Sequence, residues 1–397
     1  MPLLATCSPS KGGSEHDWRV LPAATPPTIV QPAPYEVSFG RVEGRAAPGT
    51  QRIRVLVDGR FAAEKLLTRP RFALTIALPR RDVTLRVVAV DSAGGRAVTS
   101  VGPVFGLPAE GAPYRRGPPP LPGFEDAALA STVRTLARRF RGAAAVYVQD
   151  LQTGLGAAWN ARAQFPAAST LKLAIAVELL RGLADVPPPG SRLDVLLRKM
   201  LVYSEAEAAN ALLAHIGGGS VLAGSARVNS TARALGLDNT DMYGGYIPGT
   251  RTLAALGRRR IPLRVETAPS FVGKRTTAWD LARLARAVHL AAGGSGPLVW
   301  RFRGAFTPAD ARHLLYLLAH VREPGRLTRF LSGASVLHKA GWITKARHDN
   351  GLVYWPGGAF VVTVMTWNGS GVGSASDVLA GRVALSALDR FRALRPG

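Results

Sequence analysis

The chain has 397 residues, 47% of them hydrophobic, which is long enough for two globular domains with a sizeable core. Its formal net charge is +24, from 50 Lys and Arg against 26 Asp and Glu, and such a surface attracts polyanions in general. No helix-turn-helix, zinc finger or aromatic-studded basic strand accompanies the charge, so an arginine-rich compositional bias is favoured over specific nucleic-acid binding. No run of about eighteen apolar residues occurs, and we predict no membrane span.

The N-terminal residues 1–34 are rich in Pro, Ser, Gly and Ala without a sustained period, and they predict a flexible leader. Cys7 is the only cysteine, so no disulfide can form within this chain. The residues before it resemble a lipoprotein cleavage box only loosely, because a basic stretch and a long apolar segment are missing. The segment is therefore poor support for a lipidated Cys7.

A different pattern covers residues 35–107. Three apolar or alternating segments lie at 53–57, 72–78 and 83–90, and Gly-containing turn sequences follow the first and the third. Short strands at this spacing predict an all-β sandwich, which looks like a bacterial immunoglobulin-like module. We expect it to serve as a spacer, a wall-binding unit or a platform that orients its neighbour. The Pro-rich residues 108–124 predict a semi-rigid linker to a second domain.

The second domain is expected to span residues 125–397 and to open with a helix at 126–141 and strands at 143–149 and 156–160. Next, Ser169 stands three positions before Lys172 at the start of an apolar helix. Positions i and i+3 share a helix face, so the amine can reach the hydroxyl and activate it as a nucleophile. The first helical turn also favours a developing negative charge. Taken alone, the motif more often marks a solvated helix end in a basic protein.

Two later segments complete an ordered set of motifs. Ser204 precedes a helical pattern that ends at 217–219, and Lys339-Ala-Gly341 precedes a strand-like run. Ser-x-x-Lys, then a serine on a helix, then Lys-x-Gly on a strand resembles the class A β-lactamase family and its relatives, the serine penicillin-binding enzymes. The likeness extends to a helix entry at 276–284 and to a closing strand pair at 353–364, with Pro-Gly-Gly as its turn. It implies that the sandwich is followed along the chain by an α/β domain of β-lactamase/transpeptidase type, an antiparallel sheet flanked by helices.

The resemblance implies a role for each motif residue. Ser169 is the expected nucleophile, and Lys172 and Lys339 are expected to lie close enough for their repulsion to lower one pKa. Ser204 is expected to relay a proton to the leaving nitrogen. The alternatives are purely structural roles. Ser204 would be a helix N-cap, which is compatible with a relay role, and Lys339 would be an ordinary lysine at a strand edge.

The resemblance also implies a binding surface around these residues. The backbone N–H groups of Ser169 and Trp342 are the expected oxyanion hole. Substrate contacts are expected from Ala340 and Gly341, and from Arg347 through a carboxylate. The sequence contains no metal-ligand spacing and no phosphate loop, so we expect no cofactor and no metal.

Several positions depart from the family pattern. Ala206 stands where the family places an amide, and Ala340 where it places a hydroxyl. Alignment with the omega loop puts Tyr246 or a neighbour where the deacylating glutamate is expected. Glu266 is either a replacement base or, as its basic surroundings favour, a solvated loop charge. The short connection between the first two motifs, which includes residues 187–190, predicts that one wall of the cleft is low.

His348 and Asp349 invite comparison with a Ser/His/Asp triad, but a polar hairpin end is the favoured interpretation. We therefore expect an extracellular or cell-surface serine hydrolase, monomeric, that attacks a β-lactam or peptidoglycan-like amide and is slow to deacylate. The alternative is a catalytically impaired cell-wall or penicillin-binding protein. Anionic wall polymers are a further candidate partner because of the charge.

Overall fold

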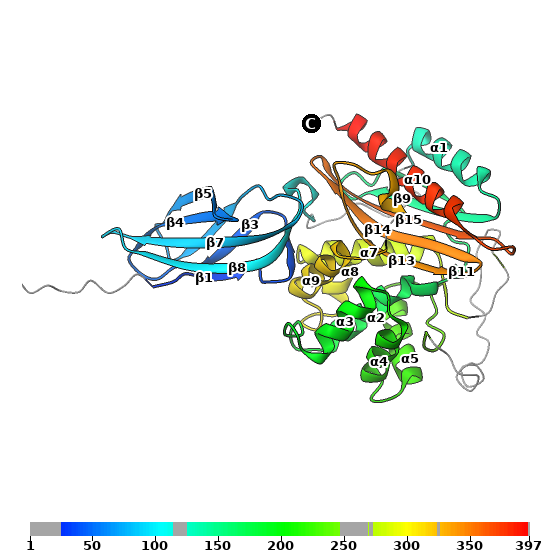
Figure 1. Ribbon diagram of the computed structural model, residues 1–397, viewed down its shortest axis with the longest axis horizontal. Helices are drawn as coiled ribbons and strands as arrows, with labels where there is room; N and C mark the ends of the chain where they lie inside the picture. The colour runs from blue at the N-terminus through cyan, green and yellow to red at the C-terminus, as the bar shows by residue number, and fades with distance from the viewer. Residues whose placement is uncertain (1–24, 114–124, 247–268, 270–272, 324–325, 396–397) are drawn as a thin grey trace, which may run out of the picture.

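The computed structural model describes residues 25–113, 125–246, 269, 273–323 and 326–395. It shows an all-β region followed by an α/β region, which confirms the predicted fold class (Figure 1). Within the described residues, no helix is both long and apolar enough to cross a membrane.

The N-terminal region is a sandwich of two sheets. One sheet has the order β1-β3-β6 and the other the order β2-β8-β7-β4-β5, in which only the β2–β8 pair is parallel. Alternate residues such as Ile53, Val55 and Leu85 point into the shared core and are fully buried. The strands are β1 (Thr28–Gln31), β2 (Glu36–Ser38), β3 (Arg41–Arg45), β4 (Thr50–Val57), β5 (Arg60–Leu66), β6 (Arg71–Thr75), β7 (Asp82–Asp91) and β8 (Arg96–Gly106).

Strand β1 corrects the predicted boundary of the leader at residue 34. It lies inside the Pro-rich segment and pairs antiparallel with β3, so the sandwich begins before residue 35. A four-residue edge strand is too short to give a sequence period, which is why composition concealed it. The predicted leader residues 1–24 lie outside the described part of the chain.

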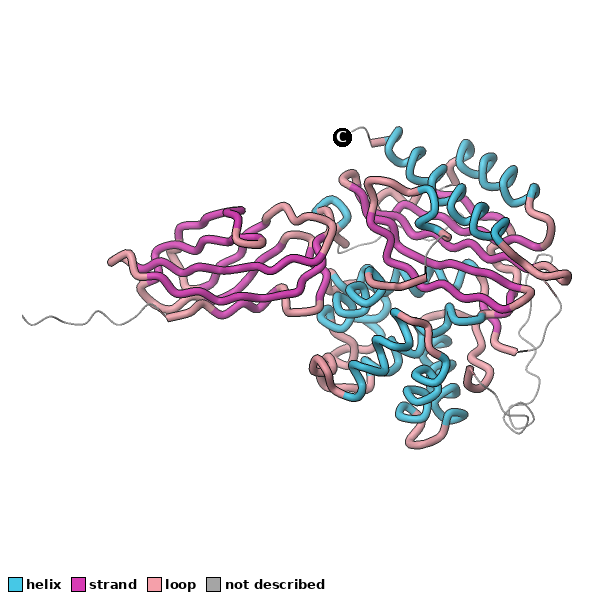
Figure 2. The backbone as a smooth tube through the Cα atoms, in the orientation of Figure 1, coloured by secondary structure: helices cyan, strands magenta, loops and turns pink. Residues whose placement is uncertain are grey.

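The second region is built on an antiparallel sheet of order β10-β9-β15-β14-β13. Its three inner strands are buried on both faces, and β13 is an edge strand (Figure 2). The predicted strand pair around Pro356-Gly357 is present as β14 and β15. The strands are β9 (Ala143–Asp150), β10 (Gly156–Trp159), β13 (Ser335–Ile343), β14 (Ala346–Trp355) and β15 (Gly358–Trp367).

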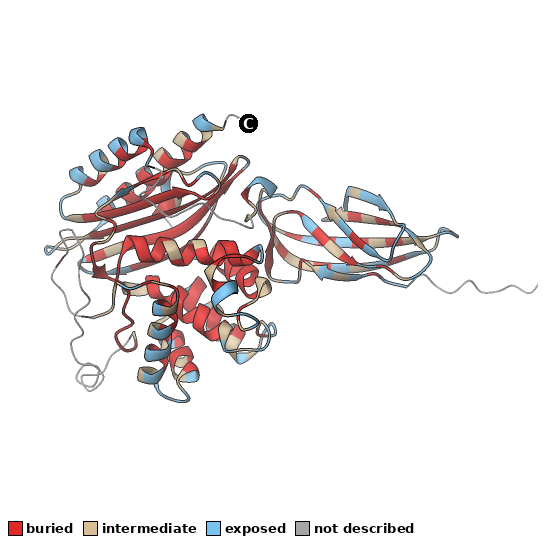
Figure 3. Cartoon of the chain, turned by 180° about the vertical axis from the view of Figure 1, so that it is seen from behind, coloured by how far each residue is buried: buried red, intermediate tan, exposed pale blue. Residues whose placement is uncertain are grey.

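Helices cover both faces of this sheet. Helices α1 (Ala127–Arg139) and α10 (Ser374–Leu394) lie on one face, and α7 (Ala278–Ala292) packs on the other (Figure 1). The other described helices lie on the same side of the sheet as α7: α2 (Lys172–Arg181), α3 (Arg192–Val202), α4 (Ala206–Ile216), α5 (Val221–Ala234), α8 (Gly296–Arg301) and α9 (Pro308–Ala319). Figure 3 shows that burial is greatest between these layers.

Helix α2 is the centre of this helical layer. Its residues 172–180 are all buried, so it is apolar around its whole circumference, as expected of a helix with neighbours on every side. The resulting core holds the N-terminal end of α2 in place, where Ser169 and Lys172 are found.

The start of the predicted linker is packed and does not act as a spacer. A short 3₁₀ turn, η1 (Ala109–Gly111), lies on the second region, where a Cβ on Gly111 would be 2.7 Å from the Tyr354 ring. The Gln152 side chain donates a hydrogen bond to the Glu110 carbonyl. The proline run of the linker lies outside the described residues.

Candidate active site

Ser169 is presented by a strained turn. Strand β11 (Phe165–Pro166) pairs with β12 (Arg275–Thr276), and the chain then enters the 3₁₀ turn η2 (Ala168–Leu171), which leads into α2. Ala168 has φ 48°, a left-handed conformation that is costly for a residue with a Cβ and is often found at functional sites. The Thr170 hydroxyl closes the turn by donating to the Ala167 carbonyl at 2.6 Å. Ser169 itself is half-buried.

The edge strand β13 lies directly against this turn. A Cβ on Gly341 would stand 2.6 Å from the Ser169 nitrogen, so only glycine permits the close approach. Gly341 therefore lets the strand that carries Trp342 lie against the nucleophile turn, and the oxyanion hole stays a prediction. The Trp342 side chain is 61% exposed and points to solvent. Ala340 is fully buried and offers no surface to a substrate, contrary to its predicted contact.

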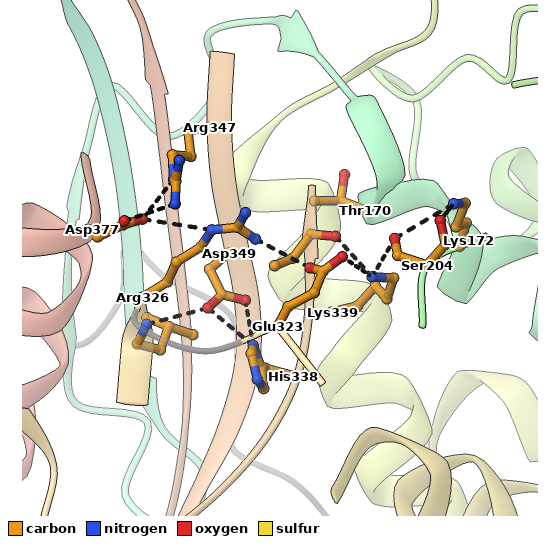
Figure 4. A network of polar contacts seen from close by, with 12 residues as sticks. Thr170, Lys172, Ser204, Glu323, Arg326, His338, Lys339, Arg347, Asp349 and Asp377 are labelled. Atoms are coloured by element: carbon orange, nitrogen blue, oxygen red, sulfur yellow. Dashed lines mark hydrogen bonds and ion pairs between the residues drawn. The ribbon is translucent and has the colours of Figure 1, made fainter. Parts of the chain in front are cut away.

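Ser204 joins the two lysines. The Lys172 amine donates to the Ser204 carbonyl and, at 3.4 Å, to its Oγ, while the Lys339 amine donates to the same Oγ at 2.9 Å (Figure 4). Ser204 has φ 61°, a second left-handed residue at the site. Helix α4 has Glu205 as its N-cap without a side-chain bond, so Ser204 does not cap it.

Lys172 thus contacts Ser204 in place of the predicted partner, Ser169. Among the described residues, both hydrogen bonds of the Lys172 amine go to Ser204. The structure nevertheless brings the four predicted residues together. Hydrogen bonds connect three of them, and the Gly341 contact brings the strand that carries Lys339 against Ser169.

Burial sets the protonation of the two amines. The pKa of Lys172 is lowered to about 7, mainly by burial and in addition by the positive charge of Lys339. Burial also lowers the pKa of Lys339, against the opposing effect of Glu323 and Asp349. Because the Lys339 amine is fully buried, it is not a lysine that guards an exposed strand edge. Lys172 can therefore be neutral, and act as a base, near neutral pH.

Tyr246 lies beside the Lys172 amine. Its backbone N–H donates to Asn210 Oδ1 at 2.7 Å, and its ring centre is 4.7 Å from the Lys172 Nζ. Burial raises the pKa of the phenol, whose oxygen has no hydrogen-bond partner among the described residues. The omega-loop alignment also predicted Tyr246 at this point in place of a carboxylate. Glu266, the candidate replacement base, lies outside the described residues.

Two site residues were missed by sequence reasoning. Glu323, in the loop after α9, places Oε1 3.4 Å from the Lys339 amine. Lys274, just before β12, has its Nζ 4.7 Å from the centre of the Tyr246 ring, and burial lowers its pKa to about 8. Neither residue belongs to a motif. Only the β11–β12 pairing, which brings residue 274 to the nucleophile turn, gives a signal for Lys274.

Two predictions about residues of β14 are corrected by the structure. Arg347 forms a bidentate salt bridge with Asp377 of α10, at 2.7 and 2.8 Å, which contradicts its contact with a substrate carboxylate. His348 and Asp349 are buried within the strand and are not a hairpin end. The His348 Nε2 donates to the Pro166 carbonyl at 2.6 Å, whereas Asp349 accepts from His338 at 2.8 Å.

The described residues contain no group of three or more His, Cys, Asp or Glu side chains that could hold a metal ion. The chemistry that this site can support is instead that of an activated hydroxyl. A half-buried serine precedes the first turn of α2, and the lysine in that turn shares the Oγ of a second serine, Ser204, with another buried amine.

The fold and this arrangement define a domain of the class A β-lactamase and penicillin-binding type. The model of the "Beta-lactamase enzyme family" matches residues 128–186 and 182–391, and the chain belongs to that family. No curated protein matches the sequence.

Solved structures of the same type share the fold at low sequence identity. PBP-A has a TM-score of 0.54 at 20% identity, over 70% of this chain and 100% of that chain. A variant of the last common ancestor of Gram-negative class A β-lactamases has a TM-score of 0.53 at 20% identity, over 68% and 100%. A β-lactamase from Chitinophaga pinensis has a TM-score of 0.51 at 17% identity, over 66% and 99%.

Proposed function

We propose that this protein is a serine hydrolase that attacks an amide in a β-lactam or a peptidoglycan-like peptide through an acyl-enzyme at Ser169. The observation that carries the proposal is the Ser204 hydroxyl, which is hydrogen-bonded to two buried lysine amines beside the nucleophile turn. A related fold supports it, since a PBP-A variant with 20% identity is described as an acyl-enzyme complex with penicillin G. We further propose an extracellular or cell-surface location, where such amides occur.

In the proposed reaction, Lys172 and Ser204 pass the serine proton to the leaving group. Ser169 Oγ attacks the carbonyl carbon and loses its proton towards the neutral Lys172 amine, with the oxyanion bound by the N–H groups of Ser169 and Trp342. The carbon–nitrogen bond breaks, and the nitrogen receives that proton through Ser204, which contacts both lysines. Water then attacks the ester, which releases the acid and returns the proton to Ser169.

We propose that hydrolysis of the acyl-enzyme is the slow half of this reaction. Water needs a base to attack the ester, and general-base catalysis typically contributes about 10²- to 10⁴-fold. Among the described residues, the Tyr246 ring lies beside Lys172 on the omega-loop side, and burial raises the pKa of its phenol, which so remains protonated. We therefore expect the acyl-enzyme to persist.

One set of observations favours the alternative, a catalytically impaired cell-wall or penicillin-binding protein. The Lys172 amine contacts Ser204 and the Tyr246 ring, and its hydrogen bonds within the described residues do not include Ser169. In this alternative the high positive charge of the chain binds anionic wall polymers, and the site retains a ligand without turning it over.

The test is to incubate the protein with a fluorescent penicillin, a chromogenic cephalosporin and an uncharged activated thioester, and to follow intact mass and hydrolysis together. We expect a stable adduct on the native protein, slow turnover, and no adduct on Ser169→Ala. Ser131→Ala, on an exposed position of α1, is the matched control and should be acylated normally. Absence of an adduct with all three probes would contradict the acyl-enzyme and favour the alternative.

A further inference from the structure

The Lys339 amine has no hydrogen-bond donor left for a substrate. An ammonium group carries three N–H donors. The three acceptors around Lys339 are Ser204 Oγ at 2.9 Å, the Ala340 carbonyl at 3.0 Å and Glu323 Oε1 at 3.4 Å. All three belong to the protein, so Lys339 is occupied before any ligand arrives.

The neighbouring arginines, Arg326 and Arg347, are paired with carboxylates of the chain as well. Arg326 Nη1 lies 3.2 Å from Glu323 Oε2, and its Nε lies 3.6 Å from Asp377. Arg347 holds the same Asp377 through two bonds. Figure 4 shows these groups as one continuous network that runs from Ser204 to Arg347. Each cation of this network is therefore already paired with a carboxylate of the chain.

Of the two charged residues that follow Ser204 in this network, Lys339 and Glu323, only Glu323 is partly exposed. Its side chain is 17% exposed, whereas the Lys339 side chain beneath it is completely buried. Ala340, on the same strand, contributes no hydroxyl and is fully buried. A group that reaches this side of the site therefore encounters an accessible carboxylate, while the positive charge lies behind it.

This side of the site is where the leaving group departs, an assignment that rests on the proposed function. Ser204 returns the proton to the leaving atom in that reaction, and Lys339 and Glu323 follow Ser204 in the chain of contacts. A substituent carried by the leaving group therefore lies near Glu323.

We propose that Glu323 is a specificity-determining residue that selects acyl donors whose leaving group carries an uncharged or cationic substituent and rejects those that carry a carboxylate. Two carboxylates placed close together repel, and the Lys339 amine that could offset this is already used. An amide can instead donate a hydrogen bond to Glu323, and an ammonium group can form an ion pair with it. Among the substrates of the proposed function, this favours amidated or cationic peptides over β-lactams, which carry a carboxylate.

Three thioesters of one N-acylglycine test the proposal, because their short leaving thiols differ in charge. The thiols are thioglycolate, thioglycolamide and thiocholine, whose quaternary ammonium group cannot take the acyl group from sulfur. In each case Ser169 Oγ attacks the carbonyl, the carbon–sulfur bond breaks, and the thiol leaves with the serine proton. The rate of adduct formation at Ser169, followed by intact mass and thiol release, gives kcat/KM for each leaving group.

We expect the order thiocholine, then thioglycolamide, then thioglycolate, with the last at least about tenfold below the amide. Glu323→Gln should raise acylation by thioglycolate about tenfold and remove the advantage of thiocholine, while Glu323→Asp should keep the native order. Glu64→Gln, in β5 of the sandwich, changes the net charge equally and should leave the order unchanged. Thermal unfolding of each variant shows whether it folds, and Glu323→Ala removes the charge if Glu323→Gln does not fold.

Failure of the proposed role of Glu323 and failure of the proposed function give different results. If all three thioesters acylate Ser169 but the carboxylate is not disfavoured, or Glu323→Gln leaves the order unchanged, the role of Glu323 is wrong and the acyl-enzyme stands. If none of the three gives an adduct, the acyl-enzyme itself is contradicted, and the selection by Glu323 with it.

Discussion

At the scale of single residues, Lys172 determines when the proposed nucleophile can be activated. Burial places its pKa near 7, and the nearby charge of Lys339 acts in the same direction. A protonated amine cannot accept the serine proton, so the reactive form of the protein is the one in which Lys172 is neutral. Such a site is switched on by rising pH in the neutral range.

We therefore predict that the rate of Ser169 acylation by an uncharged thioester rises with pH, with an inflection near pH 7, and levels off above it. Lys172→Arg keeps the positive charge but cannot give up its proton near neutral pH, so the rate should fall by about 10²- to 10⁴-fold. The inflection near pH 7 should disappear with it.

The matched control is Lys65→Arg in β5 of the sandwich, which should preserve both the rate and the pH profile. Stopped-flow thiol release between pH 5 and 9 provides the measurement. An inflection that survives in Lys172→Arg would mean that another group activates Ser169.

The sequence predicted the four motif residues because each has a fixed position in a local pattern. Ser169, Lys172, Ser204 and Lys339 do meet in the structure. Glu323 has no such pattern. Its place follows from how the loop after α9 passes over β13, and this is decided by tertiary packing.

At the scale of elements, β14 ties the sheet to the nucleophile turn. His348 donates to the Pro166 carbonyl at the end of β11, three residues before Ser169, and accepts from the Thr366 N–H of β15. Burial lowers the pKa of His348 to about 4, so the ring stays neutral in the folded protein. Protonation would remove the acceptor that Thr366 uses.

This neutral histidine predicts a loss of stability in acid. Between pH 6.5 and about 4 the unfolded chain binds a proton at His348 that the folded chain does not, so the free energy of unfolding decreases as pH falls through this window. The expected contribution is roughly 2 to 3 kcal/mol between pH 7 and 4.5. His348→Gln does not titrate and should lose correspondingly less.

Urea unfolding at the two pH values, followed by tryptophan fluorescence, measures the difference. The exposed His215→Gln on α4 is the control and should lose as much stability as the native protein. Equal losses in His348→Gln and the native protein would show that His348 is not the group that titrates.

The element scale also shows which parts of the fold the sequence could predict. The strands before and after Pro356-Gly357 are long and end at a turn signal, and the structure has them as β14 and β15. The polar residues Arg347, His348 and Asp349 suggested an exposed end of β14. The strand is nevertheless internal, because β13 and β15 pair with it on both sides and supply the partners that make burial of these residues tolerable.

At the scale of the whole molecule, the sandwich is seated on the helices that carry the site. Glu36 of β2 forms a buried, two-bond ion pair with Arg312 of α9, at 2.8 and 3.2 Å. The preceding Tyr35 accepts a bond from His313 of α9 and lies under the guanidinium of Arg198 on α3. These contacts fix α3 and α9 relative to β2. Of the three predicted roles for the sandwich, they favour the platform.

The ends of α3 and α9 lead directly to the site. The N–H of Arg322, after α9, donates to the carbonyl of Val202, the last residue of α3, at 2.9 Å. Ser204 follows Val202 by two positions, and Glu323 directly follows Arg322. A change in how the sandwich holds α3 and α9 should therefore move Ser204 and Glu323 together.

Glu36→Gln is the change that tests this coupling, because it leaves the Arg312 charge buried without its partner. Breaking a buried pair in this way typically costs about 3 to 5 kcal/mol, whereas replacing both members by apolar residues costs far less. We expect Glu36→Gln to lower both the free energy of unfolding and the acylation rate at Ser169, and Glu36→Leu combined with Arg312→Met to recover most of both. Glu43→Gln, on the exposed strand β3, should change neither. The opposite outcome is a Glu36→Gln protein that is destabilised yet acylated at the native rate. It would show that the sandwich holds the helices without setting the geometry of the site.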